Sequence, residues 1–408
     1  MATIHAFRAQ RPLPAKAAAV SAVPYDVVNT QEARALAEGN PLSFLRVSRP
    51  ELELADDTNP YADEVYARAA ANFEKLKLAA PLVVEETPSL YVYTLQMGKQ
   101  IQTGIAACAS VDEYDTDIVR KHERTRKDKE DDRTRHIVTL RAQTGPVFMT
   151  YRGRDEINQL VNDTKAGEPL YDFTAADGIK HTIWRMSDEA TAKTSEAFKA
   201  VPLFYIADGH HRAASASRAR AALKAENLNH TGDEEYNFFL TVLFPSDQLH
   251  IMPYNRLVKD LNGMSEGDFL DALLKEFVQV EVGSPTPPHK GEISMYIGGR
   301  WITLKAQHVD ATDPIRSLDV SVLQEKILDP LLGIKDIRTD KRIDFVGGIR
   351  GTQALEQAVN SGQAAVAFSM YPVSLDELIA VSDANQIMPP KSTWFEPKLR
   401  DGLLSHLI

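Results

Sequence analysis

The sequence predicts an α/β protein with mixed sheets, built from more than one packed region. Apolar runs typical of strands intersperse with segments of helical spacing along the whole chain. The length of 408 residues exceeds the usual size of a single hydrophobic core. A hydrophobic fraction of 43% and a charged fraction of 25% are those of a folded protein. We therefore expect several subdomains rather than one layer of secondary structure.

The first predicted region spans residues 1–145 and alternates helical and extended segments. Its expected helices show apolar residues at helical spacing or a run of charged residues, and cover 30–41, 59–78 and 119–143. Two apolar stretches joined by a short turn at Gly98 and Lys99 are expected to pair as strands over 89–97 and 102–110. The region thus contributes at least one hairpin to a sheet.

The second region, 146–280, contains four apolar stretches that predict strands: PVFMTYR, HTIWRM, VPLFYIAD and EYNFFLTVLFP. A helix is expected directly after VPLFYIAD. A polar segment rich in Gly and Pro at 282–292 predicts a loop before a hairpin, ISMYIGGRWITLKA. The third region, 281–408, continues as helix, strand, helix and strand. We expect all three regions to pack as one compact unit.

Charge and composition exclude several classes of function. A net charge of -11 repels phosphate backbones, so nucleic-acid partners are not expected. No apolar run is long enough to cross a membrane, and the N-terminus lacks the continuous apolar segment of a secretory signal. Cys108, the one cysteine, excludes an intramolecular disulfide and predicts a small buried residue. We expect a cytoplasmic protein with a small-molecule substrate. The sequence leaves the oligomeric state undecided, and a homodimer is one of the possibilities.

The stretch DGHHR, residues 208–212, lies where a buried strand is expected to pass into a helix. Free backbone N–H groups and the helix dipole attract an anion at such a place. Gly209 permits a tight turn or the close approach of a phosphate, and Arg212 offers a planar fork to its oxygens. The small residues that follow, AASASRARAA, allow the helix to lie close to a neighbour.

Two other interpretations of this turn stay open. In the first, Asp208 is only a helix cap and Arg212 only a surface residue. In the second, the histidines bind a metal ion. Consecutive residues on a helix point about 100° apart, so His210 and His211 do not easily face one ligand. The i, i+4 spacing of a helical zinc pair is absent. An anion site is the favoured interpretation.

The DGHHR turn resembles the signature of the ParB/sulfiredoxin-like superfamily, in which a related turn binds nucleotide phosphates. Sulfiredoxin needs a cysteine after the glycine, where this chain has His210, so its cysteine chemistry is excluded. DNA clamps of the ParB type add a helix-turn-helix domain, which the charge balance disfavours. The resemblance implies a phosphate-binding core within a larger chain.

Almost the whole chain resembles a bacterial family long described as a domain of unknown function. Six motifs in one order carry this resemblance: AVPYDVV (22–28), NPLSFLRV (40–47), KHERT (121–125), ADGHHR (207–212), MPYNR (252–256) and MPPKSTWFEPK (388–398). Their chemistry resembles that of free L-serine kinases, which make O-phospho-L-serine. The resemblance implies a phosphotransferase with Mg²⁺ and with ATP, ADP or pyrophosphate as the phosphoryl donor.

The resemblance also suggests roles for individual residues. Glu123 is the expected general base, and Lys127 is expected one helical turn beyond it. Asp208 and His210 are further catalytic candidates. Asp208 is also the expected metal ligand. The expected phosphate-binding residues are Gly209, His211, Arg212, Lys127, Arg133, Lys391, Ser392 and Thr393. The expected substrate-binding residues are Asp26, Ser43 and Arg46, with Lys398 as an added charge.

Structural alternatives remain for each of these motifs. The charged run at 119–143 is also typical of a solvated helix, and Pro24-Tyr25-Asp26 is also typical of a turn. Residues 388–398 are also compatible with a terminal segment that only packs Trp394 and Phe395 onto the body of the protein. Residues 342–353 lack the first glycine of a dinucleotide-binding fingerprint and predict only a tight turn. P-loop, protein-kinase and nucleophile-elbow signatures are absent.

Two other functions are compatible with the same turn. One is a nucleotide-binding or nucleotide-hydrolysing regulator that has no amino-acid acceptor. The other is a DNA-partition-like binding protein, which the net charge disfavours.

Overall fold

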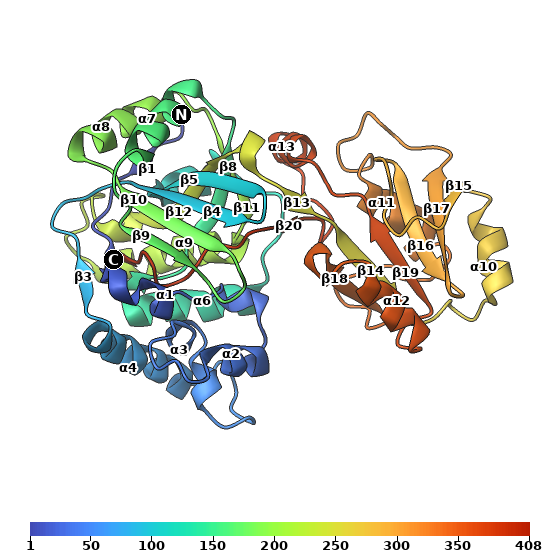
Figure 1. The fold of residues 1–408 in the computed structure, drawn as a ribbon, viewed down its shortest axis with the longest axis horizontal. Helices are drawn as coiled ribbons and strands as arrows, with labels where there is room; N and C mark the ends of the chain where they lie inside the picture. Colours follow the sequence, from blue (N-terminus) through green and yellow to red (C-terminus); the bar gives the residue numbers. More distant parts are fainter. The chain divides into compact units, whose positions relative to one another are not determined.

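The computed structural model describes residues 1–408, apart from the side chain of Val282, and confirms the mixed α/β class (Figure 1). The chain forms two compact units. The first comprises Met1–Lys121, Thr125–Leu249 and Pro397–Ile408, and the second comprises His122–Arg124 and His250–Glu396.

These units do not coincide with the three predicted regions. Strands from both sides of residue 145 pair within one sheet, so the first two regions share a single unit. The last twelve residues return to that unit, away from the rest of the third region. Hydrogen bonding between strands that are distant in sequence sets the division, and composition gives no sign of it.

The first unit is built on a nine-stranded sheet with the order β6-β11-β8-β12-β5-β4-β10-β9, in which β1 also pairs with β5. The pairs β11–β6 and β12–β8 are parallel and the other pairs antiparallel, which makes the sheet mixed. The predicted hairpin is confirmed as β4 and β5. The strands are β1 (Ile4–His5), β4 (Tyr91–Met97), β5 (Gln100–Ser110), β6 (Val119–Arg120), β8 (Val147–Tyr151), β9 (Tyr171–Thr174), β10 (Lys180–Arg185), β11 (Phe204–Asp208) and β12 (Phe238–Pro245).

Helices and two small strand pairs complete this unit. The strand pairs are β2 (Gln10–Pro12) with β3 (Leu82–Val84), and β7 (Ala142–Gln143) with β21 (His406–Leu407). The helices are α1 (Ala17–Val20), α2 (Thr30–Ala37), α3 (Leu45–Ser48), α4 (Asp63–Ala79), α5 (Val111–Asp115), α6 (Lys127–Leu140), α7 (Asp155–Lys165), α8 (Asp188–Phe198) and α9 (His210–Glu226). Cys108 is buried in β5, and burial raises the pKa of its thiol.

The small residues of α9 bring it close to α6, as the sequence predicts. Ser215 Oγ donates to the carbonyl of Glu130 at 3.2 Å, and Thr134 Oγ1 donates to the carbonyl of Ser215 at 3.5 Å. Such side-chain contacts to a neighbouring backbone require a short distance between helices. Helix α6 therefore lies along the helix that follows the DGHHR turn.

The predicted helix over 119–143 was wrong at its start, because α6 begins only at Lys127. The preceding backbone groups have partners outside any helix. The carbonyl of His122 accepts from the N–H of Met388 at 2.8 Å, and the N–H of Arg126 donates to His211 Nε2 at 3.1 Å. Glu123 is therefore not one helical turn before Lys127, and the KHERT segment is a loop.

The second unit holds a six-stranded antiparallel sheet with the order β15-β17-β16-β19-β14-β18 (Figure 1). The predicted hairpin over 293–306 is confirmed as β16 and β17, and 347–351 is the predicted tight turn. The strands of this sheet are β14 (Tyr254–Val258), β15 (Phe277–Val282), β16 (Glu292–Ile297), β17 (Arg300–Ala306), β18 (Ile343–Gly347) and β19 (Val366–Met370). A separate antiparallel pair is formed by β13 (Ile251–Met252) and β20 (Trp394–Phe395). The helices are α10 (Glu266–Leu273), α11 (Asp319–Leu323), α12 (Gln353–Asn360) and α13 (Leu375–Asp383).

Among the described residues, none of the helices has both the length and the apolar character needed to cross a bilayer.

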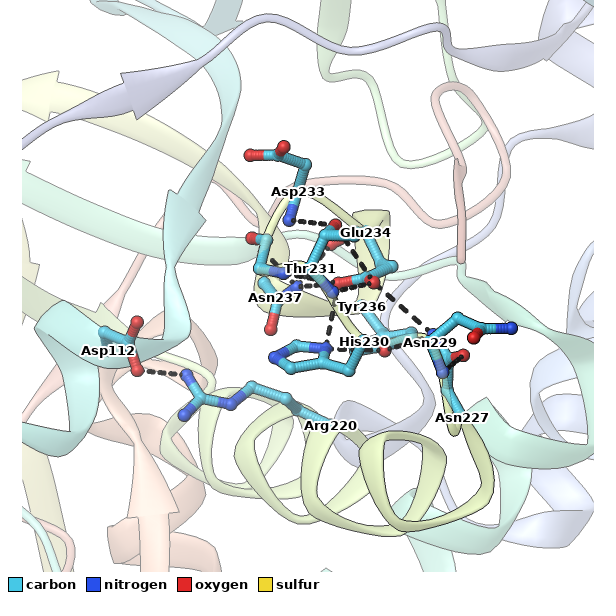
Figure 2. Close-up of polar contacts among 11 residues, drawn as sticks. Asp112, Arg220, Asn227, Asn229, His230, Thr231, Asp233, Glu234, Tyr236 and Asn237 are labelled. Atoms are coloured by element: carbon cyan, nitrogen blue, oxygen red, sulfur yellow. Dashed lines mark hydrogen bonds and ion pairs between the residues drawn. The ribbon is translucent and has the colours of Figure 1, made fainter.

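A compact loop, residues 227–237, returns the chain from the end of α9 to β12 (Figure 2). The carboxylate of Glu234 organises it. This carboxylate accepts from the N–H groups of Thr231 at 2.6 Å and Gly232 at 3.0 Å, and from Asn237 Nδ2 at 3.1 Å. Its oxygen also lies 2.9 Å from His230 Nδ1. Desolvation alone would raise the pKa of Glu234, but hydrogen bonds from backbone N–H groups, those of Thr231 and Gly232 among them, lower it to about 2.

We predict that Glu234→Gln lowers the free energy of unfolding at pH 7, because an amide accepts fewer of these bonds. The lowered pKa means that ionised Glu234 contributes stability above its ordinary pKa of 4.5, and that this contribution is lost as the pH falls toward 2. Urea denaturation should show a smaller difference between wild type and variant at pH 3.5 than at pH 7. Asp233→Asn, at an exposed neighbour, is the control and should leave stability nearly unchanged.

Candidate anion site at the strand-to-helix turn

The DGHHR segment forms the strand-to-helix turn that the sequence predicts. Strand β11 ends at Asp208 and α9 begins at His210. Gly209 between them has a φ of +95°, in the left-handed region. A Cβ atom there would also lie 3.0 Å from Cζ and Nε of Arg212. Glycine is therefore required both by the backbone conformation and by the guanidinium packed against it.

The N-terminus of α9 has two features that favour an anion. No side chain caps it and its first turn carries no acidic residue. The first backbone N–H groups of a helix have no acceptor within the helix, and the dipole adds positive potential there. With Arg212 in the same turn, the segment presents N–H donors and a cation together. This is the arrangement that binds phosphate oxygens.

Arg212 is the central cation of the site, and only 8% of its surface is exposed. Its Nη1 donates to the carbonyl of Pro146. Its Nη2 lies 3.7 Å from Asp26 Oδ2 and 3.8 Å from Asp208 Oδ1. Burial would lower the pKa of Arg212, but the carboxylates of Asp26, Asp208 and Asp401 raise it above its ordinary value. The guanidinium is thus held firmly in its charged form.

Asp208 has a second cationic partner from the C-terminal motif. Lys398 Nζ donates to Asp208 Oδ2 at 2.9 Å, across 190 residues of sequence. Burial would raise the pKa of Asp208, but Lys398 and then Arg212 lower it well below the usual range. The end of the MPPKSTWFEPK motif therefore reaches the DGHHR turn, and Asp208 stays ionised at neutral pH.

The Pro24-Tyr25-Asp26 segment lies at the same site. A short 3₁₀ turn, Tyr25–Val27, carries Asp26, and Arg49 holds this turn by donating to the carbonyls of Tyr25 at 2.9 Å and Val28 at 2.5 Å. The Arg133 guanidinium lies 4.2 Å from the centre of the Tyr25 ring. Burial raises the pKa of Tyr25, so its hydroxyl stays neutral. The structure thus brings the predicted residues Asp26 and Arg133 to the turn.

The two histidines differ in their surroundings. His211 Nε2 accepts the backbone N–H of Arg126 at 3.1 Å, which requires a neutral ring with its proton on Nδ1. Burial lowers the pKa of His211, although Asp26 opposes this effect. His210 is buried at the first position of α9. Neutral His211 thus ties the loop before α6 to the turn.

Other predicted site residues belong to the second unit. Glu123 lies in the segment His122–Arg124 of that unit. Thr393 Oγ1 lies 3.4 Å from His122 Nε2, so the KHERT and MPPKST motifs meet there. The other two predicted phosphate-binding residues of this motif, Lys391 and Ser392, are also in this unit. Ser392 Oγ donates to the carbonyl of Pro389 at 2.6 Å, and Lys391 Nζ lies 5.3 Å from the ring centre of Tyr254.

The structure gives Arg46 protein partners instead of leaving its donors for a ligand. Its guanidinium donates to Glu53 Oε1 at 2.7 Å, and to the carbonyls of Ala37 at 2.9 Å and Asn40 at 3.2 Å. These contacts join α2 to α3. Ser43 is buried beside this segment, and Lys127 is exposed at the first position of α6.

Asp401 and Ser48, which the sequence did not predict as site residues, line a cavity together with Arg212 and Arg133. No motif or periodicity points to either residue. Burial raises the pKa of Asp401 to about 7, with a further upward contribution from Asp26, while Arg212 and Arg133 oppose it. A buried carboxyl whose pKa is strongly shifted, in a cavity that two arginines also line, is a candidate for a functional site.

Among the described residues, no cluster of three or more His, Cys, Asp or Glu side chains could form a metal cage. One oxygen of Asp208 is already bonded to Lys398. Mg²⁺ commonly keeps several waters and binds one or two carboxylates together with substrate phosphates. Asp208 and Asp26, at 3.8 Å and 3.7 Å from Arg212 Nη2, are the carboxylates at the turn that could hold such an ion together with a bound phosphate.

The family model described as Protein of unknown function (DUF1015) matches residues 4–321. The chain belongs to this family. The matched part of this DUF1015 chain includes the PYD, KHERT and DGHHR segments but not the MPPKST motif. A search of the curated proteins finds no match.

Among solved structures, the DUF1015 chain is similar to three proteins of low identity. A free serine kinase in complex with AMP is 12% identical with a TM-score of 0.34, over 75% of this chain and 93% of that chain. SbnI with a C-terminal truncation, from Staphylococcus aureus, is 13% identical with a TM-score of 0.39, over 74% and 87%. A conserved hypothetical protein from Pyrococcus furiosus is 11% identical with a TM-score of 0.36, over 76% and 97%.

We predict that Asp401→Asn stabilises the protein relative to wild type more strongly at pH 8 than at pH 4.5. The raised pKa means that the native state holds the proton between the ordinary value of 3.8 and about 7, so wild-type stability falls as the pH rises through this range. Chemical denaturation at both pH values should show a relative change on the order of 1–4 kcal/mol. Asp57→Asn, at an exposed site, should show almost no such change.

Proposed function

We propose that this DUF1015 protein is a phosphotransferase that transfers a phosphoryl group from ATP, ADP or pyrophosphate to the hydroxyl of free L-serine. The observation that supports it most directly is the DGHHR turn. It combines a helix N-terminus without a side-chain cap, a glycine whose added Cβ would crowd Arg212, and a buried guanidinium. The likeness of the motifs to those of free L-serine kinases supplies the acceptor.

The donor phosphates would occupy the N-terminus of α9, where the backbone N–H groups of the first turn face them. Phosphoryl transfer relies mainly on positioning and on the neutralisation of charge. Arg212, fixed by Pro146, Asp26 and Asp208, supplies a cation that needs no rearrangement. Lys398 adds a second positive charge through Asp208. His210 lies at the first position of the helix and is assigned to the transferring group.

The reaction balances without an oxidant or reductant. The serine oxygen forms a bond to the terminal phosphorus of the donor while the bond to the leaving phosphate breaks. The hydroxyl proton passes to Glu123, which keeps its role as general base on the strength of the KHERT resemblance. The products are O-phospho-L-serine and ADP, AMP or inorganic phosphate, according to the donor. A Mg²⁺ ion bound with the donor would neutralise charge on the phosphates, with Asp208 and Asp26 as its carboxylates.

The direct test incubates the full-length protein with L-serine, Mg²⁺ and each donor separately, and follows the products by ³¹P NMR. The proposal expects an O-phosphoserine resonance with at least one donor and none when serine is omitted. Donor hydrolysis at a rate independent of serine would instead support the nucleotide-hydrolysing regulator. The absence of O-phosphoserine with all three donors would refute the serine kinase.

Gly209→Ala should weaken donor binding, with Gly178→Ala as a matched control. Both glycines have positive φ, +95° and +81°, so each alanine should cost about 1–2 kcal/mol of stability. Only at position 209 would the added methyl meet Arg212, since nothing lies within 4 Å of the Cβ position at Gly178. Calorimetric titration with pyrophosphate should therefore show a loss of affinity of at least about tenfold in G209A alone, equivalent to roughly 1.4 kcal/mol. Equal affinities in the two variants would contradict the phosphate assignment.

Glu123→Gln should lower kcat roughly 10²–10⁴-fold and leave donor binding intact, because the amide keeps the shape but cannot take the proton. The exposed Glu86→Gln variant serves as control. Steady-state kinetics with the active donor measures the effect. Full activity of E123Q would remove Glu123 from the mechanism without touching the phosphate site.

A further inference from the structure

The MPPKST segment of the second unit, residues 388–393, forms a tight turn around Lys391. Lys391 follows Pro390 and has a φ of +60°, in the left-handed region. A proline followed by a positive φ is the pattern of a type II turn, in which glycine is the preferred third residue. A side chain at this position strains the backbone, because its Cβ atom crowds the following carbonyl oxygen. Lysine is therefore present against the preference of the backbone.

Lys391 differs from the other described non-glycine residues that have a positive φ. Asp117, Asn262 and Asn385 are of the two types that adopt this conformation most readily. Arg141 ends α6, where a left-handed residue is common. Neither reason applies to Lys391. Strained residues of this kind cluster at binding and catalytic sites, which makes the Lys391 side chain a candidate for binding.

A buried arginine of the MPYNR motif holds the Lys391 turn. Arg256 Nη2 donates to the carbonyl of Lys391 at 3.0 Å, and its Nη1 donates to the carbonyl of Tyr254. Arg256 is 1% exposed, yet no carboxylate in the described part of the chain pairs with it. Burial lowers the pKa of Arg256 to about 10, whereas neighbouring carboxylates raise the pKa of Arg212. The turn is thus bonded to a cation whose charge the protein leaves uncompensated.

The turn also carries donors that have no acceptor among the described residues. Lys391 is exposed, and its ammonium group forms no ion pair there. Its Nζ lies 5.3 Å from the ring centre of Tyr254, a cation–π contact that favours a position beside the turn. The backbone N–H groups of Lys391 and Thr393 donate to none of the residues that the structure describes. The turn therefore offers an ammonium group and two N–H groups to a ligand.

We propose that the MPPKST turn binds a phosphate group, with Lys391 as the cation that contacts it. The Lys391 ammonium group pairs with the phosphate oxygens, and the N–H groups of Lys391 and Thr393 donate to the same group. Arg256 does not contact the phosphate; it holds the Lys391 carbonyl and adds a second positive charge. The inference rests on the proposed function only for the source of the phosphate, which is the donor or the phosphorylated product.

The charges of the turn favour a phosphate over a carboxylate. Lys391 and Arg256 carry two positive charges, and neither has a carboxylate partner among the described residues. A phosphate monoester carries a charge of about −1.5 to −2 at neutral pH and three strong acceptor oxygens, whereas a carboxylate carries a single charge. Lysine is a common phosphate ligand because its ammonium group acts as a compact point charge.

The hydroxyl groups of the motif have a different role from the one that the sequence predicts. Ser392 Oγ donates to the carbonyl of Pro389, so its proton closes the turn. Thr393 Oγ1 lies 3.4 Å from His122 Nε2. Of the three predicted phosphate-binding residues of MPPKST, only Lys391 then contributes its side chain to the phosphate, and Thr393 contributes its backbone.

The first test locates the phosphate by NMR. Full-length protein is labelled with ¹⁵N-lysine, and the Lys391 amide is identified as the resonance that is lost in Lys391→Arg. Inorganic phosphate, pyrophosphate and O-phospho-L-serine are titrated separately without Mg²⁺, and L-serine at equal ionic strength is the control. We expect the Lys391 amide to shift saturably with at least one phosphate compound: a response to pyrophosphate assigns the donor, and a response to O-phosphoserine alone assigns the product. No shift with any of the three, or an equal shift with L-serine, would overturn the site.

A second test uses Lys391→Gly, which separates binding from folding. Glycine adopts a φ of +60° without strain, so the unfolding temperature should equal or exceed that of the wild type. Calorimetry should nevertheless show about tenfold or greater loss of affinity for the phosphate compound that shifts the Lys391 amide. Lys335→Gly, at an exposed lysine of the same unit, is the control and should leave this affinity unchanged. Lys391→Arg keeps the charge and should retain most of the affinity.

The two proposals fail in distinguishable ways. Wild-type affinity in K391G overturns the phosphate site at Lys391, even if the protein makes O-phosphoserine. Phosphate binding that depends on Lys391, in a protein that makes no O-phosphoserine with any donor, refutes the serine kinase and leaves this site standing.

Discussion

The buried guanidinium of Arg212 is the element on which the rest of the site depends. It lies in the first turn of α9, bonds the carbonyl before β8 and lies between the carboxylates of Asp26 and Asp208. Its neighbours come from the N-terminal segment, the central sheet and α9, and Lys398 joins them through Asp208. One cation therefore fixes segments that are separated by almost two hundred residues of sequence. Gly209 makes this possible, because any side chain there would displace the guanidinium.

The parts of the fold that could be predicted are those that local sequence patterns determine. The hairpin β4–β5, the strand-turn-helix at 204–226 and the hairpin β16–β17 follow local rules: apolar runs, short turns and helical spacing. The class of the protein and the chemical character of the DGHHR turn follow from the same rules. Strand order and the two units do not, because pairs such as β12 with β8 are set by contacts across ninety residues or more.

The site was predicted in the same uneven way. Asp26, Arg133 and Lys398 were marked by motifs, and the structure places them at the turn. Asp401 and Ser48 stand in no motif, and their importance comes only from burial without partners. The start of α6 was misplaced for a related reason: the backbone of His122 and Arg126 bonds to residues that are remote in sequence, and such bonds override a local helical pattern. Arg46 shows the converse, a motif residue whose donors hold α2 and α3 together.

The concentration of charge around Arg212 is costly for stability, which bears on how the site can be studied. Removal of one member of a buried charge network leaves the others uncompensated and typically costs about 3–5 kcal/mol. Loss of Arg212 would leave Asp26, Asp208 and Asp401 facing one another, so a defect in that variant would not separate folding from function. Substitution of Asp401 acts in the opposite direction, because its carboxyl is held against its tendency to ionise. A protein that retains such a buried carboxyl gives up stability that an uncharged side chain would restore, as residues selected for function commonly do.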